Sequence, residues 1–155
     1  MIGFVLSGGA NLGSIHVGML KALLEGGVKP DVIVGTSIGA VNAAYLASDP
    51  SIETVEALED IWCDVRARDI FPLGPRHNAP ALFRRGGFFS THRWRDFITR
   101  HLPYRDFDET AVPLKITATG FEDGQSVVFD KGSAVEAVLA STALPGIFPP
   151  HEIDG

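Results

Sequence analysis

The chain has 155 residues, of which 45% are hydrophobic, and this size suits one domain with its own core. A net charge of −6 argues against nucleic acid as a partner. The single cysteine, Cys63, excludes an internal disulfide framework. It follows Trp62 at an apolar helical position, which predicts a buried and unreactive thiol.

No apolar stretch approaches the ~18 residues that a membrane span needs. The N-terminus has no basic region and enters a predicted strand at once, so no signal peptide is indicated. We therefore predict a cytoplasmic protein with a single domain over residues 1–155.

The first predicted unit is a strand over residues 2–6, a glycine-rich turn over residues 7–13, and a helix. The helix ends at Gly26 and Gly27. Its apolar residues recur with the period of a helix: Ile15, Met19, Leu20, Leu23 and Leu24. The glycine-rich turn contains Gly8, Gly9, Ala10 and Asn11. It could be a phosphate cradle, an oxyanion hole or only a tight turn.

The second unit is a strand over residues 31–34, a G-x-S-x-G turn over residues 35–39, and a helix over residues 40–46. A strand, a sharp turn and a helix in this order form the context of a nucleophile elbow, with Ser37 as the nucleophile. Gly35 and Gly39 would leave room for the turn. The alternative is an ordinary tight turn in which Ser37 caps the helix.

The dinucleotide-binding interpretation fits poorly, because Ala10 stands where the fingerprint needs a glycine and no carboxylate follows the second strand. The oxyanion interpretation fits better. Two parallel strands would bring both turns to one carboxyl edge of the sheet, where the N–H groups of the first turn face the serine of the second.

The remaining pattern is also α/β. Asp49 and Pro50 predict the start of a helix that runs to about Val65, and Thr91 predicts the cap of a short helix. A long loop separates these helices over residues 69–90. Strands over residues 114–119 and 126–130 follow, joined by a turn, and then a helix over residues 133–140.

Within the long loop, residues 82–89 combine three phenylalanines with Arg84 and Arg85. These side chains could meet an acyl chain and an anionic head group in a peripheral membrane contact. The alternative, which we favour, is that the aromatic rings pack on the domain and the arginines are solvated.

A Ser–His–Asp triad is disfavoured, because one strand alone precedes the elbow and no H-G-G-G motif is present. His16 is expected to be a half-buried structural residue. We expect no metal site, because H-x-x-x-H, C-x-x-C and a tight carboxylate cluster are all missing from the sequence.

Taken together, the motifs resemble the patatin-like phospholipases, which are serine lipid acyl hydrolases. Residues 6–13 resemble the family's glycine-rich oxyanion motif, and residues 34–40 its nucleophile elbow. Residues 140–150 are similar to the segment that precedes its catalytic aspartate. The resemblance implies a three-layer α/β/α fold with a mainly parallel sheet. It also implies a Ser–Asp dyad, lipid or acyl-ester substrates, and no cofactor or metal.

The chain departs from the family pattern in three places. Ala10 replaces a usual glycine, which is a mild change provided that its φ is negative. Leu12 stands where relatives often carry Arg or Lys. By the same resemblance, Asp154 with Gly155 corresponds to a hairpin turn. The catalytic aspartate, and with it the C-terminal part of the fold, is then expected beyond Gly155. Two other classes remain open: a non-catalytic lipid- or acyl-binding relative and, less favoured, a nucleotide-binding domain.

Overall fold

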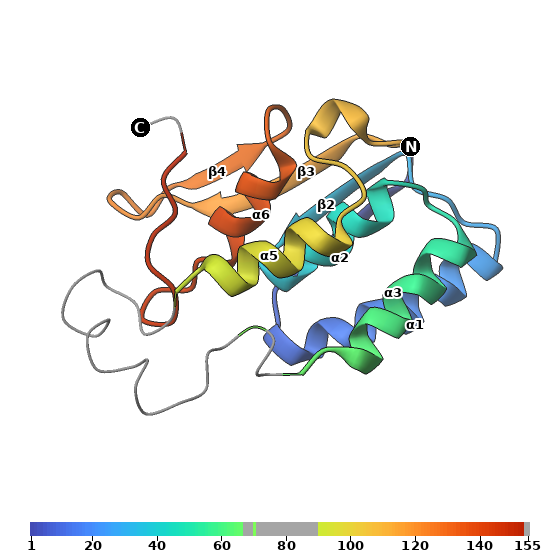
Figure 1. The fold of residues 1–155 in the computed structure, drawn as a ribbon. Helices are drawn as coiled ribbons and strands as arrows, with labels where there is room; N and C mark the ends of the chain where they lie inside the picture. The colour runs from blue at the N-terminus through green and yellow to red at the C-terminus, as the bar shows by residue number, and fades with distance from the viewer. Residues whose placement is uncertain (67–69, 71–89, 154–155) are drawn as a thin grey trace.

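The computed structural model describes residues 1–66, 70 and 90–153. Its sheet has the strand order β1-β2-β3-β4. The first three strands are parallel, and β4 pairs antiparallel with β3. The predicted α/β class with a mainly parallel sheet is confirmed (Figure 1). The strands are β1 (Gly3–Leu6), β2 (Val32–Thr36), β3 (Leu114–Thr119) and β4 (Ser126–Phe129).

Helices connect the strands in the predicted order. The α-helices described in full are α1 (Ser14–Glu25), α2 (Ile38–Ala47), α3 (Ile52–Asp64), α5 (His92–His101) and α6 (Ala134–Thr142). Two short 3₁₀ turns are η1 (Ala10–Gly13) and η2 (Phe107–Glu109). None of the helices in the described part of the chain is long and apolar enough to cross a membrane.

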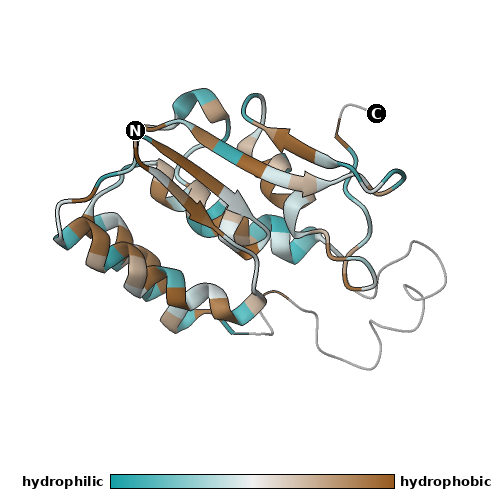
Figure 2. Ribbon diagram, turned by 180° about the vertical axis from the view of Figure 1, so that it is seen from behind, coloured by the Kyte–Doolittle hydropathy of each residue, from teal (hydrophilic) through white to brown (hydrophobic). Residues whose placement is uncertain are grey.

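One face of the sheet packs against helices. Strand register aligns Phe4 with Ile33 and Ile33 with Leu114, and all three side chains are buried. Helices α2, α5 and α6 lie on this side (Figure 1). On the opposite face, Val5 is 74% and Val128 is 52% exposed. Figure 2 shows this face uncovered by helices. Of the three layers implied by the resemblance, the described residues form two.

Helix α1 is apolar on two sides rather than one. Val17, Leu20 and Leu24 are buried against neighbouring helices, whereas Ile15 and Met19 are exposed by 57% and 56%. The sequence period correctly located the helix but could not separate the two apolar faces, because both repeat at the same helical spacing.

Two further predictions need correction. Helix α3 is capped by Ser51, whose Oγ accepts a hydrogen bond from the Thr54 N–H (3.2 Å), and not by Asp49. Cys63 is exposed, because the buried face of α3 is the one that carries Val55 and Leu58. The predicted aromatic and arginine segment at 82–89, and Asp154, lie outside the described residues.

Candidate active site

The turn between β2 and α2 places Ser37 at the N-cap of α2 with φ 54° and ψ −124°. This left-handed region is strained for a residue with a side chain, and such strain is typical of functional turns. Both flanking glycines are sterically required. A Cβ on Gly35 would lie 2.6 Å from the Ala40 Cα, and one on Gly39 would lie 2.1 Å from the Leu6 carbonyl oxygen. The predicted sharp turn is therefore confirmed.

The glycine-rich turn lies beside this serine. Strands β1 and β2 pair in parallel, with Leu6 opposite Gly35, so both turns leave the same edge of the sheet. A Cβ on Gly8 would lie 3.3 Å from the Ser37 Cβ and 3.9 Å from its Oγ. A glycine at position 8 thus keeps the space beside the Ser37 hydroxyl open.

Ala10 adopts φ 50°, so the condition for a mild replacement of glycine is not met. The backbone of Ala10 is held in a conformation that glycine, which has no Cβ, adopts more easily. The N–H groups of Gly9, Ala10 and Asn11 donate to no acceptor within the described chain, and all three residues are exposed. Such unpaired, solvent-facing donors are what an anion or an oxyanion needs.

The backbone of Ser37 is held by α6, which the sequence analysis did not foresee. The Ser37 N–H donates to Ser141 Oγ (2.7 Å), and the Ser141 hydroxyl donates to the Thr117 carbonyl oxygen (2.7 Å). The Thr36 and Thr117 hydroxyls also form a short hydrogen bond across β2 and β3. Ser141 therefore links the turn, the sheet and α6.

No described carboxylate or imidazole hydrogen-bonds to Ser37. His16 is half-buried, as expected, and lies 3.2 Å from Asn42 through its Nδ1; burial lowers its pKa below the ordinary value. His151 donates instead to Glu136 (2.7 Å). The structure thus brings Ser37 together with the glycine turn and places no general base beside it among these residues.

One cluster of carboxylates was not predicted from the sequence. Asp106, Asp108 and Glu109 are exposed, and their carboxylate oxygens lie within 4.8 Å of one another. Glu109 is already engaged, because its carboxylate accepts the N–H groups of Arg105 and Asp106, each at 2.9 Å. The bond from the Asp106 N–H belongs to the capping box of η2, which is a structural role.

Comparison with known proteins identifies the family of the chain. The family described as patatin-like phospholipase matches residues 4–155. The chain belongs to this family.

Among curated relatives, the neuropathy target esterase of Drosophila melanogaster is 44% identical over 149 residues, which are 96% of this chain and 10% of that protein. An uncharacterized NTE family protein of Mycobacterium tuberculosis is 30% identical over 151 residues, covering 96% of this chain and 39% of that one. The chain therefore spans well under half the length of these relatives.

Among solved structures, the type III effector ExoU matches with a TM-score of 0.55 and 21% identity, over 93% of this chain and 39% of that chain. Its complex with SpcU from Pseudomonas aeruginosa matches with a TM-score of 0.56 and 22% identity, over 96% and 37%. At this identity the likeness establishes the fold. It supports the arrangement of the sheet and its helices described above.

Proposed function

We propose that this chain carries the nucleophile and oxyanion hole of a serine hydrolase that cleaves acyl esters of lipids. The observation that carries the proposal is the strained Ser37 turn at the start of α2, directly beside the unpaired donors of the glycine turn. The family and the esterase names of its relatives support lipid hydrolysis at the family level.

In the proposed reaction, Ser37 Oγ gives its proton to the general base and attacks the ester carbonyl carbon. The ester C–O bond breaks, the alcohol leaves with that proton, and water then hydrolyses the acyl-enzyme to free the fatty acid and Ser37. Negative charge develops on the carbonyl oxygen. The N–H groups of the glycine turn would stabilise it, and one such donor typically contributes about 3 kcal/mol. The helix dipole at the N-terminus of α2 adds to the same field.

The resemblance implies an aspartate as the general base. Asp154 is the candidate within the chain, although the motif pattern assigns it to a hairpin turn. Asp154→Asn tests this assignment directly. Loss of turnover would make Asp154 the base, and retained turnover in the protein would place the base elsewhere.

The nucleophile itself is tested with a fluorophosphonate probe, which modifies activated serines. We expect labelling of the protein, its loss in Ser37→Ala, and its retention in Ser126→Ala, because Ser126 lies exposed on β4. Fatty-acid release from phospholipid vesicles should follow the same pattern. A folded protein whose labelling is unaffected by Ser37→Ala would contradict the proposed nucleophile.

A non-catalytic acyl-binding protein is the second candidate, because no base contacts Ser37 among the described residues. This candidate predicts lipid binding without labelling or turnover. Thermal stabilisation by NAD or ATP, again without labelling, would instead favour a nucleotide-binding domain. Cytoplasmic location and peripheral membrane contact remain part of the proposal, and cell fractionation tests both.

A further inference from the structure

Asn42 is a fully buried amide within a helix whose neighbouring core residues are apolar, with 0% of its surface exposed. Buried amides destabilise a fold unless their polar atoms are paired. All of its polar atoms are paired here. Its Nδ2 donates to the Gly13 carbonyl oxygen (2.9 Å), and its Oδ1 accepts from Trp62 Nε1 (3.0 Å).

These two partners fix the orientation of the amide. The Trp62 indole can only donate and the Gly13 carbonyl can only accept, so the oxygen and nitrogen of Asn42 cannot be exchanged. The second hydrogen of Nδ2 then faces His16 Nδ1, which lies 3.2 Å away. His16 must accept there, and its ring therefore carries the proton on Nε2.

The Asn42 side chain connects the glycine-rich turn to the helix that follows the nucleophile turn. Gly13 ends η1, the 3₁₀ turn that begins at Ala10 in the glycine-rich loop. Asn42 lies on α2, the helix that begins directly after Ser37. Contact at this point is tight, since a Cβ on Gly13 would lie 2.7 Å from Ile38 Cγ1 and 3.0 Å from Trp62 Cζ2.

We propose that Asn42 is a positioning residue: its side chain sets the distance between the oxyanion donors of the glycine turn and the hydroxyl of Ser37. The inference rests on the proposed function and adds a residue to its machinery. Asn42 is buried, so it does not touch the substrate. It acts through the carbonyl of Gly13, with Trp62 and His16 holding its orientation.

Oxyanion donors must lie near 3 Å from the developing charge, and a displacement of about 1 Å can lower the rate by about 10²-fold. Loss of the Asn42 amide should therefore weaken stabilisation of the transition state. Binding of the unreacted ester should change little, because that state depends weakly on these donors.

The test uses Asn42→Leu, which keeps the branching and the number of side-chain heavy atoms and removes the hydrogen bonds. The matched control is Tyr104→Phe. It removes another buried bond to α2, the one from the Tyr104 hydroxyl to the Ala44 carbonyl (2.6 Å), and leaves the glycine turn untouched. Trp62→Phe serves as a milder variant that remains informative if Asn42→Leu fails to fold.

Two ligands separate positioning from general destabilisation. A trifluoromethyl ketone lipid forms a hemiketal with the serine and uses the oxyanion donors, whereas a non-hydrolysable ether lipid does not. For Asn42→Leu we expect kcat to fall and the ketone Ki to rise, each by about 10- to 100-fold, with KM and ether affinity within about twofold. Trp62→Phe should show the same pattern with a smaller change, and Tyr104→Phe should leave all four values within about twofold.

The proposal is overturned if Asn42→Leu, or Trp62→Phe in its place, weakens both ligands equally or leaves the ketone Ki unchanged. It is also overturned if Tyr104→Phe reproduces the selective loss. Ser37→Ala provides the separate arm: if it does not weaken ketone binding, the proposed nucleophile fails, whatever Asn42 does.

Discussion

Gly39 leaves no room for a side chain at the base of the nucleophile turn. A Cβ there would lie 2.1 Å from the Leu6 carbonyl oxygen and 2.5 Å from the Ser7 carbonyl oxygen, and backbone atoms cannot move aside cheaply. We expect Gly39→Ala to destabilise the fold by about 3 kcal/mol or more, the upper end for overpacked sites. Urea denaturation measures this change.

Gly18 provides the matched control, since it lies within α1 and a Cβ there would meet nothing within 4 Å. Gly18→Ala should stabilise the protein by about 0.5–1 kcal/mol, because alanine restricts the unfolded chain and favours the helix. Equal effects of the two substitutions would contradict the steric account of Gly39.

The sequence predicts the role of some single residues of the site and not of others. Ser37 could be found, because its glycines and its strand and helix are neighbours along the chain. Ser141 could not, since it meets the Ser37 N–H from 104 residues away. The network of Asn42 was equally invisible, because a lone asparagine in an apolar helix carries no local pattern that names its partners.

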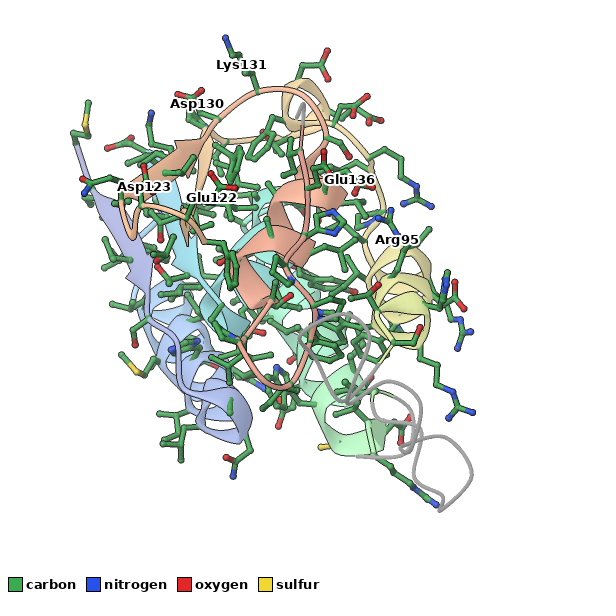
Figure 3. The ribbon with its side chains drawn as sticks, turned by 90° about the vertical axis from the view of Figure 1, so that its left-hand side faces the viewer. Arg95, Glu122, Asp123, Asp130, Lys131 and Glu136 are labelled. Atoms are coloured by element: carbon green, nitrogen blue, oxygen red, sulfur yellow. The ribbon has the colours of Figure 1, made fainter. Side chains whose placement is uncertain are left out.

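At the scale of elements, α5 and α6 are joined by a charge cluster. Arg95 on α5 pairs with Glu136 on α6 through two hydrogen bonds, one of them 2.8 Å long, and the two side chains point toward one another in Figure 3. His151 of the C-terminal segment donates to the same carboxylate. Arg95 foremost, and then His151, lower the pKa of Glu136 from 4.5 to about 2.

A carboxyl group with a depressed pKa in the folded state stabilises the fold above its unfolded pKa. That contribution is lost as pH falls from about 4.5 to about 2. We expect Glu136→Gln to lower the free energy of unfolding by about 1 kcal/mol at pH 6, a modest value for a partly exposed pair. The difference from the native protein should vanish near pH 2. Denaturation at both values measures it, and a constant difference would refute the coupling.

Elements were predicted well where the signal is local. Every described strand was located within one or two residues, because each is a short apolar run bounded by turn residues. The predicted cap of α3 was wrong, because the sequence offers two adjacent start signals. One is Asp49 followed by Pro50, and the other is Ser51. Only the hydrogen bond from the Thr54 N–H to Ser51 decides between them. The exposed apolar face of α1 could be identified only from the tertiary structure, because the helical period alone does not say which apolar face other elements cover.

For the whole molecule, the uncovered sheet face is the main consequence of the topology. The crossover from β2 to β3 puts α2 on one side of the sheet, and α6 packs against α2 and β3 on that same side. The described residues therefore leave the other side open (Figure 2). The parallel pairing of β1 with β2 was implied by two successive units of strand, turn and helix. The exposure of one sheet face could not be predicted, because the strands carry apolar residues on both of their faces.

An exposed apolar face on an edge strand favours self-association. In sedimentation experiments we expect the chain to form larger species as its concentration rises. Val5→Lys should reduce this association without lowering the melting temperature, since Val5 is 74% exposed. Ser126→Lys adds the same charge without removing apolar area and should have a smaller effect. Equal behaviour of Val5→Lys and the native chain would exclude this face as the contact.

The hydrogen bond from the Ser37 amide to Ser141 also affects how the nucleophile turn opens to solvent. That amide cannot exchange its hydrogen with solvent unless the elbow separates from the C-terminal end of α6. Opening the turn away from the sheet therefore breaks its hydrogen bond to α6. The strained serine turn is thus supported by a helix whose Ser141 lies 104 residues further along the chain, so the elbow has this support only when α6 is docked on the sheet.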